Sequence, residues 1–542
     1  MRRSQLPGLF VHPPCWVAAL AAVLSFGSVC VAGDGTRATI LAHYMPWYET
    51  PDGRGFWGSH WTGFNAEADP TQVDPSGRRD VWSNYYPLIE PYDSIDPFVL
   101  ECQLLQMKLA GIDGVIADWY GLANATDYPL IHEATEALFT AAGEQDMLFA
   151  ACFEDRTVGF LLSIGVLQPT DVTSHLASTF AWMQSNWFSQ PQYLIKDGRP
   201  VLLNFGPISV TDGATWDAAL APLPVRPYFF ALHNLWTLAN ADGAFMWVHW
   251  SVWDGNPTLE VIRDRLAVLF SGPSSNPDLV IPSAVPGFDD VYEPPMQTFP
   301  FLDYRGGDTF REALSFAVEG PWPIVQLPTW NDYGEGTMIE PTREFGYLFL
   351  EIVQEVRRDE LGAAFPYTAS DLRLPSKLLT LRRLGGTPSS ELDAIAAALR
   401  NGDTQTASEA IQDASEALVA TQPASVIVDA GQSLSFTVAV AAAASQFSVT
   451  WSRDGVPLAD GDGVSGSAST ALQIASSSPL SAGVYTATVS FGDIAVESAS
   501  ALGAVRASPL GASDVNNDGL VDTDDATEFI TLFEAASSRS RE

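Results

Sequence analysis

Basic residues and cysteines are scarce in this sequence of 542 residues. It has 27 Lys and Arg against 65 Asp and Glu, which gives a formal net charge of −38. A field of that sign repels phosphate backbones and anionic lipid, so we expect no nucleic-acid partner. Only four cysteines are present, and two of them lie in the first 30 residues. The remaining pair, Cys102 and Cys152, allows at most one disulfide and excludes a disulfide-built scaffold.

Several catalytic signatures are also missing. The sequence has no HExxH or other zinc-spaced cluster, no Gly-rich phosphate loop after its first strand-like run, and no serine nucleophile elbow. We therefore expect no catalytic metal and no organic cofactor.

Long hydrophobic runs are confined to the N-terminus. Arg2 and Arg3 precede WVAALAAVLSFGSVCVA, which is too short and too poorly flanked for a membrane span and leads to small residues near Ala32. We predict a secretory signal peptide at residues 1–32, with a lipoprotein signal at Cys30 as the weaker alternative. The exported chain then has no membrane span and is secreted, periplasmic or attached to the cell surface.

Between residues 36 and 362, short apolar runs rich in β-formers alternate with longer helical stretches. This alternation is typical of a parallel sheet covered by helices, and eight repeats predict an α/β fold of the (β/α)8 barrel type. An open doubly wound sheet is the alternative. The expected strands are 38–48, 113–121, 147–155, 200–206, 227–234, 244–250, 278–287 and 323–332.

Polar and aromatic residues stand at the ends of most of these strands, where barrel enzymes place their chemistry. A long insertion at residues 49–96, with the sequence GFWGSHWTGF, is expected to form one wall of a cleft. The predicted substrate-binding residues are Tyr44, Trp47, Tyr48, His60, Trp61, Asp118, Trp119, Tyr120, Glu154, His249, Trp250, Trp253, Asp254, Trp330, Asn331, Tyr333 and Glu340.

The stretch TWNDYGEGTMIEPT follows the eighth strand. It places Asp332 and Glu335 three residues apart on one loop, which can aim both carboxylates into one cleft, as glycosidic cleavage requires. Gly334 and Gly336 permit a tight backbone path there. We predict Asp332 and Glu335 to be catalytic; the alternative is that they cap the next helix or bind backbone amides.

TWNDYGEGTMIEPT, with HYMPWY and DGVIADWYG, resembles glycoside hydrolase families 71 and 99 over residues 36–362. Family 99 contains endo-acting α-mannosidases, and family 71 contains α-1,3-glucanases. In family 99 the motif reads Asn-Glu-Trp-x-Glu-Gly-Thr, followed by Ile-Glu. Asn331, Glu335, Gly336, Thr337, Ile339 and Glu340 match it.

The resemblance implies that Glu335 is the general acid/base. It implies that Asp332 takes a proton from the sugar 2-hydroxyl, which allows an epoxide-like intermediate and retention at the anomeric carbon. Asp332 replaces a Glu of family 99 and draws the carboxylate back by about 1–1.5 Å. The corresponding motif of family 71 normally has Asp at this position. The difference therefore points to another substrate, and both an α-mannan and an α-1,3-glucan stay open as the substrate.

The composition and periodicity of the sequence change in its C-terminal third. Residues 363–420 read as a helical appendage, and residues 421–506 alternate with period two. VTWSRDGVPL and LSAGVYTATVSFG resemble an immunoglobulin-like β-sandwich, with Trp451 in its core and Tyr485 at the tyrosine corner. The usual cystine is absent, because Ala487 stands two residues after Tyr485.

The stretch DVNNDGLVDTDD has the spacing of a calcium loop within residues 511–535. The predicted metal ligands of a structural Ca²⁺ are Asp514, Asn516, Asp518, Leu520, Asp522 and Asp525, with Gly519 at the turn. The loop and the following helix resemble half of a dockerin. That resemblance implies a cohesin-like or cell-surface partner, and a solvated acidic tail is the alternative.

These features together predict an exported, retaining, endo-acting α-glycoside hydrolase that cleaves an α-mannan or α-1,3-glucan type of polysaccharide. A non-catalytic polysaccharide-binding protein with the same aromatic cleft is the first alternative. A role for the barrel in polysaccharide assembly is the second, and the predicted export signal argues against it.

Overall fold

The computed structural model describes residues 37–292, 299–441, 447–506, 515 and 527–532. The predicted signal peptide lies outside these residues, and so do all six predicted calcium ligands, Asp514, Asn516, Asp518, Leu520, Asp522 and Asp525. Residues 527–532, which follow the predicted calcium loop, are helical. The signal peptide and the calcium site therefore stay predictions.

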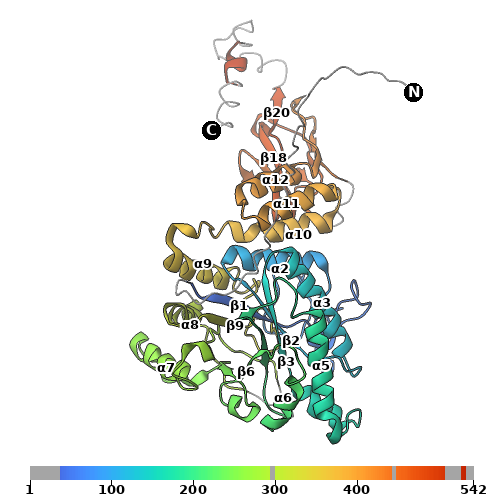
Figure 1. The fold of residues 1–542 in the computed structure, drawn as a ribbon. Coiled ribbons are helices and arrows are strands. Elements are labelled where there is room, and N and C mark those ends of the chain that lie inside the picture. Colours follow the sequence, from blue (N-terminus) through green and yellow to red (C-terminus); the bar gives the residue numbers. More distant parts are fainter. Residues whose placement is uncertain (1–36, 293–298, 442–446, 507–514, 516–526, 533–542) are drawn as a thin grey trace, which may run out of the picture.

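Eight parallel strands form a closed barrel in the first two thirds of the chain (Figure 1). Their order along the sheet is β8-β7-β6-β5-β3-β2-β1-β9, and the pairing of Ser283 with Gln326 joins the two ends. All eight expected strands are confirmed, and the open doubly wound alternative is wrong. The strands are β1 Thr39–Tyr44, β2 Gly114–Trp119, β3 Leu148–Phe153, β5 Arg199–Asn204, β6 Tyr228–Leu232, β7 Gly243–Phe245, β8 Val280–Ile281 and β9 Ile324–Pro328.

The barrel interior is filled by apolar side chains from alternate strand positions. Leu41, Ile116, Val201, Phe230 and Phe245 are among its members, and each is fully buried. The short strand β4 (Ile195–Lys196) pairs antiparallel with β5. In the described part of the barrel region, nine α-helices connect or cover the strands: α1 Ser59–Thr62, α2 Pro97–Ala110, α3 Tyr128–Glu144, α4 Arg156–Ser163, α5 Val172–Asn186, α6 Gly213–Leu220, α7 Leu259–Ser271, α8 Asp308–Glu319 and α9 Leu348–Leu361.

Arg357, on α9, is fully buried at the amino-terminal end of the barrel. Its guanidinium forms ion pairs of 2.5 Å with Asp113 and with Glu360. It also donates hydrogen bonds to the carbonyls of Gly111 and Ala38 at 2.8 and 3.0 Å. This one side chain therefore links the last barrel helix to the segments that lead into β1 and β2.

We expect Arg357→Met to lower the free energy of unfolding by about 3–5 kcal/mol, because it removes a fully buried ion-pair partner from two carboxylates and a hydrogen-bond donor from two carbonyls. Urea titration followed by tryptophan fluorescence measures the loss. The neighbouring Arg358 is exposed, and Arg358→Met is the matched control with an expected change within about 0.5 kcal/mol. Equal losses in the two variants would contradict the assignment.

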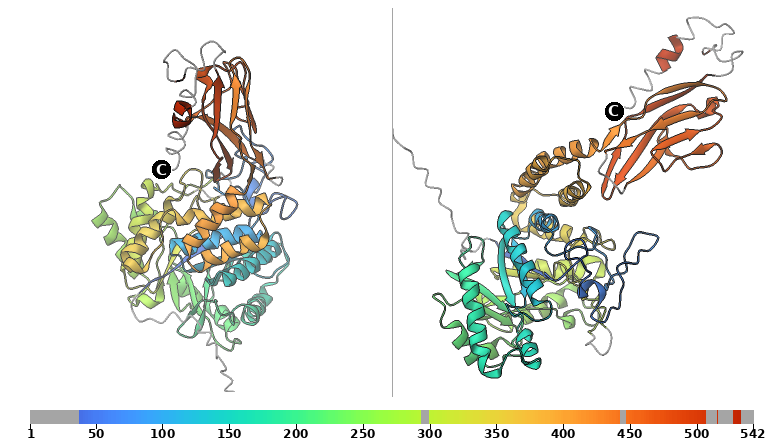
Figure 2. Two further views of the ribbon diagram at one scale, coloured as in Figure 1. Left: turned by 90° about the horizontal axis from the view of Figure 1, so that it is seen from above. Right: turned by 90° about the vertical axis from the view of Figure 1, so that its right-hand side faces the viewer.

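Within residues 374–416 three helices follow the barrel: α10 Leu374–Leu384, α11 Ser389–Arg400 and α12 Thr404–Glu416. Of these, α10 and α11 pack on α2, and α12 packs on α10 and α11. Arg382 forms a two-pronged ion pair with Glu101 of α2 at 2.7 and 2.9 Å. Asp493 in the C-terminal β region accepts hydrogen bonds of 2.7 Å from Ser376 and Thr380. Figure 2 shows these helices between the barrel and the C-terminal β region.

The C-terminal β region has two main sheets around Trp451 and Tyr485, which are both fully buried, and most of its strand pairs are antiparallel. The Tyr485 hydroxyl donates to the carbonyl of Ser481, as a tyrosine corner does. The strands are β10 Val419–Thr421, β11 Val426–Asp429, β12 Leu434–Thr437, β13 Ala439–Val440, β14 Ser448–Arg453, β15 Val456–Pro457, β16 Val464–Ser465, β17 Ala471–Ile474, β18 Gly483–Phe491, β19 Ile494–Glu497 and β20 Ala501–Arg506. The β-rich character is confirmed, and the immunoglobulin-like assignment stays a prediction.

Within the described ranges, none of the helices has the length and apolar character needed to cross a bilayer. Cys102 and Cys152 are both buried and unpaired, so they form no disulfide with each other.

Candidate active site

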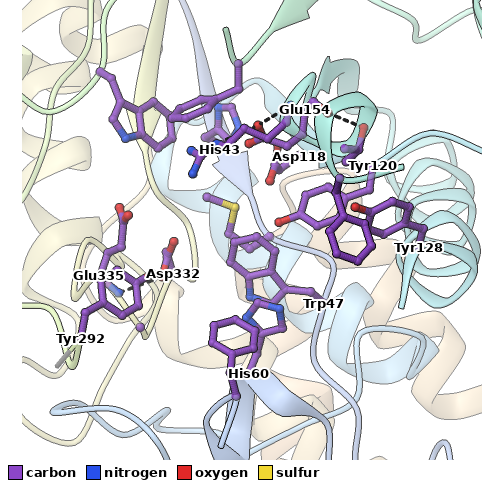
Figure 3. Close-up of a pocket in the computed structure, with 18 of the residues that line it drawn as sticks. His43, Trp47, His60, Asp118, Tyr120, Tyr128, Glu154, Tyr292, Asp332 and Glu335 are labelled. Carbon is purple, nitrogen blue, oxygen red and sulfur yellow. Dashed lines mark hydrogen bonds and ion pairs between the residues drawn. The ribbon is translucent and has the colours of Figure 1, made fainter. Parts of the chain in front are cut away.

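A cavity of about 360 Å³ lies at the carboxyl ends of the barrel strands. Figure 3 shows Asp332, Glu335 and Tyr292 on one side of it and Tyr120 and Tyr128 on the other. Its lining residues are His43, Met45, Trp47, His60, Phe64, Trp82, Asp118, Tyr120, Tyr128, Glu154, Arg156, Thr157, Phe160, Phe205, Trp247, Tyr292, Asp332, Gly334 and Glu335. Both predicted catalytic carboxylates therefore reach the same pocket.

A tight turn after β9 sets the positions of Asp332 and Glu335. The Asp332 carboxylate accepts the backbone N–H of Glu335 at 2.9 Å, and the Asp332 N–H donates to the Thr329 hydroxyl at 2.8 Å. Gly336 has φ +66°, and a Cβ there would lie 2.7 Å from the carbonyl of Asp289. The tight path thus requires glycine at 336. At Gly334, whose φ is not positive, a Cβ would make an ordinary 3.5 Å contact.

The two carboxyl groups have different protonation preferences. Burial raises the pKa of Asp332 to about 6, against the opposing effect of hydrogen bonds from the N–H groups of Glu335 and Gly334. Burial and the nearby Asp332 charge raise the pKa of Glu335 well above its usual value. Glu335 has a buried Oε2 with no hydrogen-bond partner. Near neutral pH this pair provides a base in Asp332 and a protonated acid in Glu335.

Two further carboxyl groups line the pocket at the ends of β2 and β3. Asp118 and Glu154 are buried, and burial raises the pKa of Asp118 well above its usual value and that of Glu154 to about 7. Arg156 donates to Glu154 at 3.1 Å and opposes both shifts. Among the described residues that line the pocket, Arg156 is thus the one Lys or Arg side chain beside four acidic groups.

The insertion at residues 49–96 forms one wall of the pocket, as the sequence predicted. His60, Phe64 and Trp82 come from it. The His60 ring stacks on Trp47 with centroids 4.2 Å apart, and burial lowers the pKa of His60 to about 3. These flat apolar faces can stack on the rings of a sugar.

A buried hydrogen-bond network lies beneath the catalytic turn. Asn331 exchanges two hydrogen bonds with the backbone of Met45, at 2.8 and 3.1 Å, and so ties β9 to β1. The Glu340 carboxylate accepts from Tyr92, Tyr333 and Gln103 at 2.7–2.8 Å. Burial raises the pKa of Glu340 to about 7 against these three donors. These hydrogen bonds hold the catalytic turn in place.

The structure brings seven predicted residues to the pocket: Trp47, His60, Asp118, Tyr120, Glu154, Asp332 and Glu335. Twelve others do not line it. Tyr44, Tyr48, Trp61, Trp119, Trp330, Asn331, Tyr333 and Glu340 are buried behind the site, and His249, Trp250, Trp253 and Asp254 lie to its side. His249, for example, contacts His233 with its Nε2 at 3.1 Å. These twelve residues are therefore not assigned contacts with the substrate.

Strand alternation explains many of the differences. Successive side chains of a strand point to opposite faces. Asp118 faces the barrel interior, so Trp119 faces outward, where its indole contacts His132 at 3.3 Å. The same alternation turns Tyr44 outward, where it donates to Gln103 at 2.6 Å, and turns His43 inward. Applied from Asp118, this rule would have found His43 among the lining residues.

Eleven further side chains line the pocket without having been predicted: His43, Met45, Phe64, Trp82, Tyr128, Arg156, Thr157, Phe160, Phe205, Trp247 and Tyr292. His43, Phe205 and Trp247 lie on strands or directly after them, where alternation is a usable signal. Arg156 and Phe160 come from the start of α4, and Tyr292 comes from a loop, where no periodic pattern in the sequence predicts which side chains face the pocket.

A (β/α)8 barrel with paired acidic groups at the carboxyl ends of its strands is an arrangement that suits an enzyme cleaving glycosidic bonds. No family model matches the chain. Over 321 residues it is 22% identical to the glycoprotein endo-alpha-1,2-mannosidase-like protein of Mus musculus, covering 55% of this chain and 68% of that protein. It is 23% identical over 354 residues to the glycoprotein endo-alpha-1,2-mannosidase of Rattus norvegicus, covering 58% and 70%. The chain is a distant relative of these proteins and spans about two thirds of their length.

A solved structure of a glycoside hydrolase family 99 endo-alpha-mannosidase from Bacteroides thetaiotaomicron is also similar. It is 18% identical and covers 59% of this chain and 98% of its own, with a TM-score of 0.44.

Proposed function

We propose that the protein is an exported glycoside hydrolase that cleaves an α-linked polysaccharide internally with retention at the anomeric carbon. One observation carries the proposal: Asp332 and Glu335 reach the same pocket with pKa values that favour a base and an acid. The distant relationship to proteins named endo-mannosidases supports glycosidic cleavage.

The proposed reaction divides the work between the two carboxyl groups. Asp332 accepts the proton of the sugar 2-hydroxyl, and the freed oxygen attacks the anomeric carbon of the same sugar. Glu335 gives its proton to the leaving glycosidic oxygen as that bond breaks. The resulting 1,2-anhydro sugar is then opened by water, with Glu335 taking the water proton and Asp332 returning its own. Two inversions at the anomeric carbon give net retention.

The proposed substrate is an α-mannan, because the 2-oxygen of an α-mannoside is trans to the leaving oxygen and can attack the anomeric carbon in line. In an α-1,3-glucan the two oxygens are cis, so that polymer is the alternative and would need another route. The names of the relatives favour mannose as the substrate sugar, whereas Asp332 matches the family 71 form of the motif. The net charge of −38 disfavours a phosphorylated or uronic-acid chain, because like charges repel. A neutral polysaccharide is therefore the expected class.

Incubation with a panel of α-mannans and α-1,3-glucans tests this function. We expect oligosaccharides by mass spectrometry and α-configured new ends by early-time NMR, from the wild type only. The Asp332→Asn, Glu335→Gln double variant is the control for contaminating activity. Binding of a polymer that neither protein cleaves would support the polysaccharide-binding alternative.

We expect kcat/KM to follow a bell-shaped pH profile, since this parameter reports the free enzyme. Asp332 must be ionised, so activity rises as the pH increases through about 6. Glu335 must be protonated, so activity falls again as the pH rises through its elevated pKa. Initial rates at constant ionic strength measure both limbs. A profile that is flat from pH 5 to 8 would contradict this division of roles.

A further inference from the structure

Three polar side chains meet at the floor of the barrel pocket, each from a different one of three adjacent strands. They are His43 of β1, Asp118 of β2 and Cys152 of β3, and the last two are register partners. The ring nitrogen, carboxylate oxygen and sulfur that could bind a metal all lie within 4.8 Å of one another. Among the described residues this is the group that brings three such donors together.

Two of these donors have no protein partner. His43 is fully buried, and its Nε2 makes no hydrogen bond, while its Nδ1 faces the Gln326 side-chain oxygen at 3.4 Å. Asp118 is 5% exposed, and its Oδ1 also lacks a hydrogen bond. Cys152 is a fully buried free thiol. Buried polar atoms without partners are costly, so two of them at one point indicate a missing ligand.

The donor set selects the chemistry of that ligand. Imidazole, carboxylate and thiolate together suit a borderline divalent metal of the zinc class, whereas Ca²⁺ and Mg²⁺ prefer oxygen alone. A tetrahedral zinc with bonds of about 2.0–2.3 Å holds its ligand atoms roughly 3.3–3.8 Å apart. The cluster would need to contract by only about 1 Å to reach this geometry.

We propose that His43, Asp118 and Cys152 form a binding site for a zinc-class divalent metal at the floor of the pocket. His43 and Asp118 line the cavity, so the ion enters from the pocket and presents its fourth position to it. Binding exchanges the thiol proton, and the carboxyl proton where present, for metal bonds and releases them to solvent. The neutral imidazole donates its Nε2 lone pair. This site has no recognisable sequence motif, because the three ligands are 75 and 34 residues apart.

Cobalt(II) is the probe for the test, because a cobalt–thiolate bond produces a charge-transfer band in the near ultraviolet. The exported chain, free of the predicted signal peptide with Cys15 and Cys30, is stripped with a chelator and titrated. We expect one equivalent of Co²⁺ to saturate the band and Zn²⁺ to displace it. Asp118→Asn should weaken binding at least about tenfold.

The second buried cysteine provides the matched control. Cys102 lies in α2 outside the cluster, and Cys102→Ser leaves Cys152 as the sole thiol of the exported chain. A band in Cys102→Ser therefore assigns the ligand to Cys152, even if Cys152→Ser does not fold. Where Cys152→Ser folds, by near-ultraviolet circular dichroism, the band must vanish. Folded wild type without a thiolate band would overturn the proposal and leave a bridging water as the partner of His43 and Asp118.

Discussion

We expect Glu335→Gln to lower kcat/KM on the polymeric substrate by about 10²–10⁴-fold, the range that one general acid contributes. Glutamine keeps the size of the side chain and cannot give a proton to the leaving oxygen. Position 335 lies on a loop with part of its side chain open to the pocket, so the fold should survive the change. Thermal unfolding of the two proteins checks that.

The leaving group separates loss of the acid from general damage. An aryl glycoside with an acidic phenol as leaving group needs no protonation, so Glu335→Gln should recover most of its first-step rate on it. Glu260, exposed on the first turn of α7, offers the control Glu260→Gln, which should match the wild type on both substrates. An equal defect of Glu335→Gln on polymer and aryl glycoside would assign Glu335 a role other than that of the acid.

Much of the barrel could be predicted because its signal is local. Runs such as DGVIADWYG are near-continuously apolar since a parallel strand is buried on both faces, and helices separate them at regular intervals. The catalytic turn was equally accessible, because Asp332, Glu335 and Gly336 are close in sequence. Closure of the barrel was inferred from the number of repeats, and the short β7 and β8 show that a long apolar run can contain little regular strand.

The position of a residue at the end of a strand predicts whether it lines the pocket less well than the face of the strand on which its side chain lies. Trp119, Trp330 and Tyr44 are aromatic residues of the kind that stack on sugar rings, but they are buried in the scaffold behind the site. Aromatic side chains carry so much apolar area that a core uses them as readily as a cleft does. Only the face of the strand on which a side chain lies decides between these roles. A single sequence indicates that face at the few positions where a polar residue must point into the pocket.

The support of the catalytic turn depends on contacts between distant segments. Glu340 receives its three donors from residues 92, 103 and 333, which come from the insertion, from α2 and from the turn itself. Its buried carboxylate was assigned to the substrate from the sequence, since proximity to Glu335 was the only information there. Hydrogen bonds across more than 200 residues leave no pattern in composition or spacing.

The Asp332→Asn variant should show a loss of kcat/KM of about 10²–10⁴-fold on polymer and on the aryl glycoside alike. Asparagine keeps an oxygen that can accept the Glu335 N–H, now 2.9 Å away, so the turn is retained. It cannot accept the 2-hydroxyl proton, and a better leaving group does not replace that step. Asp254 is exposed and does not line the pocket, so Asp254→Asn is the control, with an expected rate close to wild type.

The residual activity of Asp332→Asn should also have a changed pH profile, which a purely structural role of Asp332 would not produce. After burial, the Asp332 charge is the largest cause that raises the pKa of Glu335. Asparagine removes that charge, so the pKa of Glu335 falls and the alkaline limb of the profile moves to lower pH. The rise near pH 6 should disappear in the same variant, because the group that causes it is gone. An unchanged profile at reduced rate would show that Asp332 only shapes the turn and that another carboxyl group, Asp118 or Glu154, is the base.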